Sequence, residues 1–436
     1  MKTLRLAIVA IVVLGSVSAF ATNARVESMG KNSTFIMDDI SIFDNPANIN
    51  LYPNFLIGEL GHYLYHPDSV KIGQNRDPLD PWFGGIFSLD IGSGNSLSIA
   101  GVLNRRDERL LKYFPDRIGV GNAMGGRSVM APAPVSNFDG FLGANFNNKA
   151  VGLHIYVAHQ DGIGGDGLID KDAHVSALQF DGGINFELSS NYSIEVAGGA
   201  ARIQYGPKDR DFWGGDFSGF ASARLFSKVQ AINGHLIPAA SFRSMAAPGR
   251  EELDITGGMG VDAAFDRGFF WLGLQGFYND QRAGRNWVKD ANGVTTFYDI
   301  DVPKDSKDAR LQQIGGTISF GIERNIWWDW FVLRVGGKKT ISYASYERGD
   351  AGVNSILCPS VQVISGNMIG CTNDGNYFVT NPVNDGTKDD HVGFGFGINV
   401  EEKLKIDATV AEDVVFRNPF QGSGRLLSRV SATYSF

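Results

Sequence analysis

Apolar and polar residues alternate one by one over many segments of the chain. In one such segment the apolar positions are Val392, Phe394, Phe396, Ile398 and Val400. The intervening positions are His391, Gly393, Gly395, Gly397 and Asn399. Successive side chains of a β-strand point to opposite faces of the sheet. The pattern therefore predicts strands with one apolar face and one face of polar or small residues.

The same alternation recurs along almost the whole chain. Sixteen candidate strands lie near residues 54–65, 82–92, 95–104, 136–147, 149–159, 173–187, 191–204, 215–226, 234–244, 254–265, 269–280, 309–323, 329–343, 390–400, 403–415 and 424–436. Their charged residues, such as Asp181, Glu195, Asp407 and Arg429, fall on the polar face. A membrane barrel exposes its apolar face to lipid and its polar face to the lumen. We therefore predict an all-β, transmembrane antiparallel β-barrel of about 14–16 strands, spanning residues 54–436.

The connections between these strands fall into two classes that we expect to alternate strictly. Short turns include Asn147-Asn148-Lys149 and Asp266-Arg267-Gly268, whereas long connections cover about 105–135, 160–172, 281–308 and 344–390. Outer-membrane barrels have short periplasmic turns and long outer loops. This arrangement indicates a bacterial outer-membrane protein with both ends of the barrel in the periplasm.

The first 21 residues have the features of an export signal. Lys2 and Arg5 precede a short apolar stretch that ends at Ala19-Phe20-Ala21, a small-x-small cleavage pattern. An N-terminal membrane anchor is the alternative, but the apolar stretch is short for a spanning helix. We expect a mature chain that begins near Thr22.

The other end of the chain carries a second export feature. Leu426, Val430, Ala432, Tyr434 and Phe436 alternate with polar residues up to the final position. This segment resembles the C-terminal strand signal by which outer-membrane barrels are recognised for assembly. We expect Tyr434 and Phe436 to form that signal and the barrel-assembly machinery to be a partner.

A local pattern follows the predicted signal segment. Met29-Gly30 precedes an acidic stretch with Asp38-Asp39, and Asn45-Pro46-Ala47 follows. About 20 residues here resemble the start of the FadL-type outer-membrane channels for hydrophobic compounds, which open with Met-Gly, an acidic-polar stretch and Asn-Pro-Ala. The resemblance implies that Asn45, Pro46 and Ala47 belong to a hatch folded into the barrel. Independently, the apolar residues of 22–53 need cover, and the lumen is the nearest place for a plug, whether static or a moving gate.

Charge and cysteine content narrow the partners. Two of the 39 basic residues lie in the signal segment, which leaves 37 against 47 acidic residues in the mature chain. An acidic protein is poorly suited to bind nucleic acid. Cys358 and Cys371 lie in one polar stretch, which in an exported protein predicts a loop-closing disulfide, with two free thiols as the alternative.

Two further clusters of residues admit more than one interpretation. The aromatic groups Trp327-Trp328-Trp330 and Phe269-Phe270-Trp271 fit girdles at the lipid–water boundary, with core positions as the alternative. The basic loop of Arg105, Arg106, Arg109, Lys112 and Arg117 is expected to be solvated, or to contact lipopolysaccharide phosphates.

Catalytic and metal chemistry have little support in the sequence. The seven histidines, at positions 62, 66, 154, 159, 174, 235 and 391, lie in no catalytic motif, although His154 and His391 are expected to face the lumen. The acidic loop from Asp161 to Asp172 does not match the calcium-binding EF-hand spacing and is expected to be solvated. We predict no enzyme activity, no cofactor and no metal.

Two functions remain. The first is a passive channel or transporter for small molecules, with hydrophobic compounds among its candidate ligands. The second is a non-transporting barrel, such as a scaffold, an adhesin or a secretion partner, which the long 344–390 loop favours. In either case the outer-membrane lipid and lipopolysaccharide surround the protein.

Overall fold

The computed structural model describes residues 23–60, 81–105, 107, 110, 136–161, 174–206, 212–213, 217–247, 250–283, 295–297, 300–302, 307–349, 375–379, 390–401, 403–410 and 427–436. The predicted signal segment, Cys358 and Cys371 lie outside these residues, as do Arg106, Arg109 and nearly all of the acidic loop. No helix among the described residues is long and apolar enough to cross a membrane.

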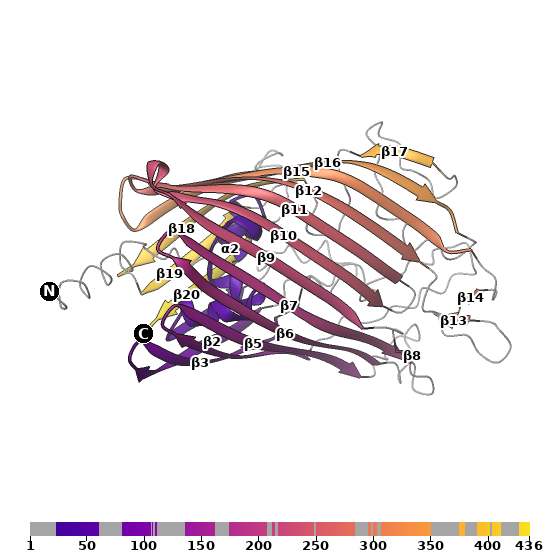
Figure 1. Ribbon diagram of the computed structural model, residues 1–436, viewed down its shortest axis with the longest axis horizontal. Coiled ribbons are helices and arrows are strands. Elements are labelled where there is room, and N and C mark those ends of the chain that lie inside the picture. The colour runs from indigo at the N-terminus through magenta and orange to yellow at the C-terminus, as the bar shows by residue number, and fades with distance from the viewer. Residues whose placement is uncertain are drawn as a thin grey trace.

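Within the described residues, sixteen strands form one closed antiparallel barrel (Figure 1). They are β1 (Phe55–Leu60), β2 (Trp82–Gly92), β3 (Asn95–Leu103), β4 (Ser136–Phe146), β5 (Lys149–Asp161), β6 (His174–Ser189), β7 (Tyr192–Gly206), β9 (Ser218–Val229), β10 (Gly234–Ala247), β11 (Arg250–Phe265), β12 (Gly268–Ala283), β15 (Ala309–Asn325), β16 (Phe331–Glu347), β18 (His391–Val400), β19 (Leu404–Val410) and β20 (Leu427–Ser435). The predicted fold class is confirmed, with the strand number at the upper end of the expected range.

Four shorter strands accompany the barrel. Two of them extend its wall: β8 (Phe212–Trp213) pairs with β7, and β17 (Gly375–Val379) pairs with the end of β16. The other two, β13 (Thr295–Phe297) and β14 (Ile300–Val302), form a separate hairpin between β12 and β15.

The barrel closes by pairing of its first and last strands. β1 pairs with β20 from Phe55↔Ser435 to Leu60↔Val430, and its other edge pairs with β2. Phe436, the last residue, donates its backbone N–H to the Asn54 carbonyl at 3.1 Å. In lipid an open strand edge would leave backbone groups without partners, so this pairing makes a membrane barrel possible.

The two faces of the wall have opposite polarity, as predicted. In the middle of β15 the large outward side chains are apolar, and Ile314 is 61% exposed, whereas the inward Ser319 is fully buried. The four charged residues expected on the lumen face are all buried there, namely Asp181, Glu195, Asp407 and Arg429. Large apolar side chains are thus exposed outside and polar ones enclosed inside, which is the polarity of a protein surrounded by lipid.

The aromatic clusters divide between the two faces. Trp327, Trp328 and Trp330 lie exposed at the turn between β15 and β16, with the Trp328 and Trp330 rings stacked at 5.1 Å. Trp271 is fully buried and faces the lumen. The prediction of a girdle position is therefore wrong for Trp271, because the alternation along β12 points residues 271, 273 and 275 inward.

One connection differs from the expected alternation of short and long loops. β10 continues to Ala247 and β11 begins at Arg250, and these two residues still pair with each other. Only Pro248 and Gly249 join them, at the end of the barrel where the long connections lie. The prediction of strict alternation is wrong here, because both strands continue several residues beyond their apolar pattern.

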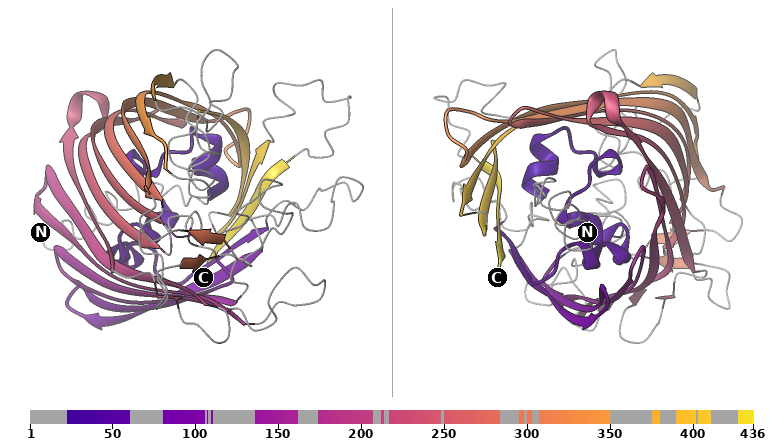
Figure 2. Two further views of the ribbon diagram at one scale, coloured as in Figure 1. Left: turned by 90° about the vertical axis from the view of Figure 1, so that its right-hand side faces the viewer. Right: turned by 60° about the vertical axis from the view of Figure 1, so that its left-hand side comes forward.

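Residues 23–54 lie inside the barrel as short helices (Figure 2). The segment contains α2 (Asn23–Ser28) and three 3-10 turns, η1 (Ser33–Phe35), η2 (Asp39–Phe43) and η3 (Pro46–Leu51). α2 contacts β16 and β18–β20, η1 contacts β10–β12, and η3 contacts β3–β6. The segment therefore crosses the lumen from one wall to the other.

The polarity of the outer face can be tested by placing a charge at two depths of β15. We expect Ile318→Lys to lower the free energy of unfolding by about 2–4 kcal/mol, because lysine lies near the middle of the lipid-facing band. Gln312→Lys, on the same face but near the outer end, should cost about 1 kcal/mol or less. Urea unfolding of the protein refolded into liposomes measures both values, and equal costs would contradict the proposed depth.

Candidate functional site: the lumen and its N-terminal segment

Asn45, Pro46 and Ala47, the residues predicted to form a hatch, begin the turn η3 against the barrel wall. The Asn45 side chain accepts a hydrogen bond from the Ala47 backbone N–H at 3.1 Å, and Pro46 occupies the first position of the turn. A polar cap followed by proline is a common start of a helix, since it uses a backbone position that needs no intrahelical donor. The sequence motif therefore has a local structural reason.

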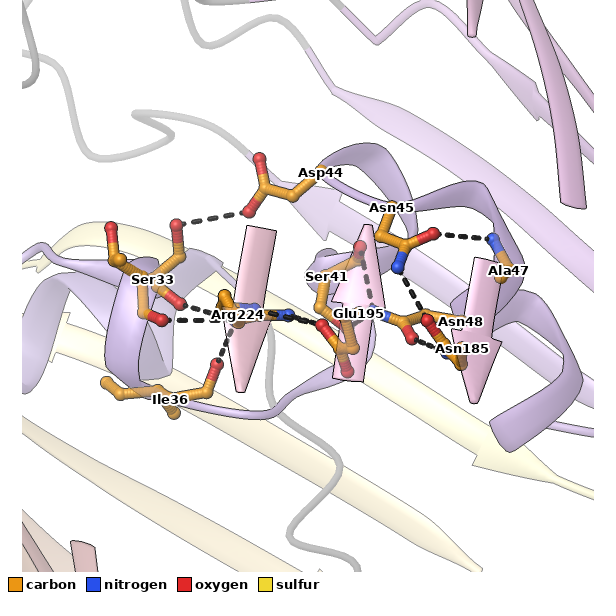
Figure 3. Close-up of polar contacts among 11 residues, drawn as sticks. Ser33, Ile36, Ser41, Asp44, Asn45, Ala47, Asn48, Asn185, Glu195 and Arg224 are labelled. Atoms are coloured by element: carbon orange, nitrogen blue, oxygen red, sulfur yellow. Dashed lines mark hydrogen bonds and ion pairs between the residues drawn. The ribbon is translucent and has the colours of Figure 1, made fainter. Parts of the chain in front are cut away.

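The same asparagine joins the segment to the wall (Figure 3). Its amide donates to the Asn185 side-chain oxygen on β6 at 2.6 Å, and Asn185 in turn donates to Asn48. Asn48 donates to the Ser41 hydroxyl at 2.9 Å. This chain of amides connects the turns η2 and η3 to β6 without using a charge.

Lumen-facing glycines provide the surface on which the segment lies. A Cβ added to Gly152 on β5 would overlap the backbone of Pro46, and one added to Gly183 on β6 would overlap the Asn45 side chain. Gly336 on β16 and Gly393 on β18 are similarly close to the backbone of Met29 and Glu27. The small-residue face predicted from the sequence is thus the contact surface for residues 27–47.

Gly30, of the Met-Gly pair, is required by two separate constraints. Its φ of +97° is a backbone conformation that residues with a Cβ rarely adopt. A Cβ at this position would also lie 2.7 Å from the Phe320 carbonyl oxygen of the wall. Gly30 allows the chain to turn directly against β15 and β16.

Arg224 on β9 holds the middle of the segment (Figure 3). Its Nε donates to Glu195 on β7 at 2.9 Å, while Nη1 donates to the carbonyl oxygens of Thr34 at 3.2 Å and Ser33 at 3.3 Å. Guanidinium has five donors in a fixed plane, so one side chain can bind a carboxylate and several carbonyls at once. Arg224 fixes the turn η1 to the wall in this way.

A chain of buried charges anchors α2. Arg25 binds both carboxylate oxygens of Glu323 on β15, at 2.6 and 2.8 Å. Glu323 also accepts from Arg334 on β16 at 3.0 Å, and Arg334 donates to Asp407 on β19 at 2.6 Å. Alternating signs let each buried charge keep a partner, and removal of one member would leave another charge uncompensated.

Arg105 contributes a third contact, contrary to the expectation that it lies in a solvated or lipopolysaccharide-binding loop. It is buried, donates to Asp139 on β4 at 3.0 Å, and lies 3.8 Å from the centre of the Phe43 ring. His154, on the lumen face as predicted, contacts Asp139 at 2.9 Å and Asp181 at 2.7 Å. Arg105 turns inward because buried Asp139 and the aromatic ring of Phe43 both attract a cation.

Apolar side chains of the segment fill the remaining space between these polar contacts. Phe35 packs against Trp271 on β12, with ring centroids 6.5 Å apart. Phe43 contacts Trp82 on β2 and Phe141 on β4 with edge-on rings. The segment and the wall thus share two apolar clusters, one around Phe43 and one around Phe35.

Asp38 and Asp39 are buried in this segment with incomplete hydrogen bonding. Both oxygens of Asp39 and one oxygen of Asp38 have no hydrogen-bond partner among the described residues. Removal from water disfavours the charged form, so burial raises the pKa of Asp38 to about 8 and that of Asp39 well above its ordinary value. The acidic pair noticed in the sequence is therefore a source of strain in the seated segment at neutral pH.

The lumen also contains a chamber of about 350 Å³ next to the segment. Its floor includes Lys31, Asn32 and Thr34, and its wall is formed mainly by β9–β12. Most lining residues of β10, and both of those on β11, lie in the halves of these strands that lead to residues 248 and 249. The chamber thus lies on the side of the segment that faces the long connections, which is the outer side in barrels of this kind.

Sequence reasoning singled out Asn45-Pro46-Ala47, Met29-Gly30 and the acidic pair, but it missed the residues that anchor the segment. Arg25, Arg224 and Glu323 drew no attention, because an isolated charge on a polar strand face has many possible partners. Arg25 and Glu323 are 298 positions apart in the chain. The one available signal was that the lumen face carries both signs of charge, which indicates pairing across strands.

Comparisons with other proteins give a shared barrel architecture. No family model matches the chain, and neither does any curated protein. Among solved structures, the chain is similar to a deltaS2 mutant of the TodX monoaromatic hydrocarbon channel, with 11% identity, 97% and 100% of the two chains covered, and a TM-score of 0.35. A Pseudomonas aeruginosa FadL homologue is 14% identical, with 95% of this chain and 98% of that chain covered and a TM-score of 0.34. CdiB from Escherichia coli is 9% identical, with 88% of this chain and 63% of that chain covered and a TM-score of 0.41. At these identities and TM-scores the similarities assign the chain no family, role or substrate.

The glycine contact surface can be tested with two neighbouring glycines of β6. We expect Gly183→Val to displace the segment, since its side chain would occupy the position of Asn45, and to make residues 23–54 at least tenfold more sensitive to a protease. Gly182→Val points to the lipid face, where an added Cβ meets only the Leu153 side chain at 3.9 Å. Equal protease sensitivity of the two variants would contradict the seating described here.

The acidic pair generates a pH-dependent prediction. A carboxyl whose pKa is raised by burial is favoured in its protonated form, so the seated segment should be most stable below about pH 4 and lose stability as the pH rises toward 8. Asp38→Asn keeps the cap on Ile40 and removes the titrating group. We expect the protection of residues 23–54 from hydrogen exchange to change less between pH 4 and 8 in this variant than in the wild type. The same pH dependence in both proteins would contradict the role given to Asp38.

Proposed function

We propose that the protein is a passive outer-membrane channel for small molecules, in which residues 23–54 act as a movable plug. Asn45, Pro46 and Ala47 are then the wall-facing end of this plug. The observation that carries the proposal is the chamber of about 350 Å³ on the outer side of the plug, because its size suits one small molecule.

The way the plug is held also supports movement. Its described contacts are hydrogen bonds, ion pairs and two apolar clusters shared with the wall. Several of the polar contacts depend on single side chains, such as Arg224 and Arg25. Polar contacts of this kind can be replaced by water when a segment leaves the wall, whereas an apolar interface of the same area would resist wetting. The buried Asp39 carboxyl has no hydrogen-bond partner among the described residues, so its burial lowers the stability of the seated plug.

The alternative is a barrel that does not transport and serves as a scaffold, an adhesin or a secretion partner. The observation in its favour is that the segment contacts strands all around the lumen. The long 344–390 loop, which first suggested this function, lies mostly outside the described residues. The two functions predict different electrical behaviour and can be separated in one experiment.

We expect the reconstituted protein to give rare conductance steps in a planar bilayer, and Arg25→Gln to make them at least tenfold more frequent. The substitution removes the ion pair that fixes α2 to Glu323, and breaking a buried pair costs about 3–5 kcal/mol. Arg282→Gln is the matched control, since Arg282 forms an ion pair with Asp280 outside the lumen and is partly exposed. Toluene and glucose, added separately, test hydrophobic and polar solutes for block of the current.

A cross-link between the plug and the wall should have the opposite effect of Arg25→Gln, because it prevents the plug from leaving the wall. Asn45→Cys with Asn185→Cys, in a chain whose Cys358 and Cys371 are replaced by serine, places two thiols where the amides hydrogen-bond directly. A short bifunctional thiol reagent should abolish the steps, and a reagent cleaved by reductant should restore them. Complete absence of steps in wild type, Arg25→Gln and a chain lacking residues 23–53 would refute the channel and favour the scaffold.

A further inference from the structure

The chamber above the plug is lined by polar and by apolar groups. On each wall strand the inward positions belong to the lining, and they carry hydroxyl, amide or charged groups on β10, β11 and β12, such as Ser241, Thr256 and Gln275. Apolar atoms, including those of Phe277 and Met245, make up the larger part of the exposed lining. A molecule in the chamber therefore meets hydrogen-bonding groups set among apolar contacts.

Three hydroxyls lie side by side across neighbouring strands of the wall. Ser222 on β9 pairs in register with Ser241 on β10, and Ser241 pairs with Thr256 on β11. Within the described part of the chain, Ser222 and Ser241 have no hydrogen-bond partner, and Ser241 is exposed to the chamber. Two hydroxyls are thus available to a ligand at one level of the wall.

A buried amide points to a ligand independently of these hydroxyls. Gln179 on β6 lines the chamber and is only 1% exposed. Its Nε2 donates to Asp181 at 2.6 Å, while its Oε1 has no partner among the described residues. A buried carbonyl oxygen without a donor is costly, and a donor group of a bound molecule would satisfy it.

The charges around the chamber largely compensate one another. Arg224 is bound by Glu195, Arg429 lies 3.1 Å from Glu27, and Arg243 lies 3.4 Å from Glu252. The other two charged residues of the plug surface in the lining, Lys31 and Asp44, have opposite signs. This balance gives no strong preference for an anion or a cation.

We propose that the chamber binds neutral molecules with several hydroxyl groups, of the size and chemistry of small sugars. Hydroxyls both donate and accept, so they can hydrogen-bond to Ser222 and Ser241 at one level of the wall, or to Gln179 at another, while the aromatic ring of Phe277 offers apolar contact to carbon-bound hydrogens. A hydrocarbon in the same place would desolvate these polar groups without replacing their hydrogen bonds. The inference rests on the proposed channel function and names the solute class for which the chamber is suited.

Saturation-transfer NMR on the full mature protein in detergent micelles tests this assignment, with glucose and sucrose as probes and toluene and decanoate as comparison ligands. We expect the sugars to bind, and the double variant Ser222→Val with Ser241→Val to bind them about tenfold more weakly, since each lost hydrogen bond contributes about 0.5–1.5 kcal/mol. Valine suits a strand, and heat-modifiable electrophoresis verifies that the variant barrel is folded.

Ser244→Val is the matched control, because residue 244 lies on the face of β10 opposite to Ser241 and outside the chamber lining. Sugar binding that is retained in Ser244→Val and weakened in the double variant supports the assignment. The absence of sugar binding overturns the assignment. Binding of toluene and decanoate without binding of sugars would show that the chamber prefers hydrophobic molecules. Sugar binding without conductance in any variant would refute the channel and leave the binding site standing.

Discussion

Every feature of this molecule depends on the pairing of β1 with β20. In the hydrocarbon layer each unpaired N–H or C=O group costs several kcal/mol, so a sheet can persist there only when it has no edge. The six-residue pairing from Phe55↔Ser435 to Leu60↔Val430 removes both edges at once. It joins residues from the two ends of the chain, and it encloses the lumen in which all the polar contacts described above are found.

Closure also sets the problem that the N-terminal segment addresses. A sixteen-stranded barrel has an interior too wide for wall side chains alone to fill. The wall responds with glycines such as Gly152 and Gly336, which make room for a backbone, and with charged residues such as Glu323 and Arg224, which bind it. The glycines make room for the backbone of the segment, and the charged side chains bind it at fixed points. The segment therefore follows one defined path across the lumen.

Charged and polar anchoring has a consequence that apolar packing would not have. A core built from Phe35, Trp271 and Phe43 alone would hold the segment by exclusion of water and would resist hydration. Here the apolar groups are separated by ion pairs and amides, and two buried carboxyls, Asp38 and Asp39, oppose burial. The free energy that holds the segment is therefore the difference between strong contacts and built-in strain. Such a balance suits a plug that must both close a lumen and leave it.

The sequence by itself determined the export-type architecture, the position of each strand and the face to which most residues point, because the two-residue period of a strand is a local property. It also singled out Asn45-Pro46-Ala47, whose turn start in the structure depends on local capping. Only the tertiary structure decided that Arg105 faces the lumen, that β10 and β11 stay paired as far as Ala247 and Arg250, and that Arg25 binds Glu323. These outcomes depend on which strands become neighbours across the closed barrel, and no local pattern of residues carries that information.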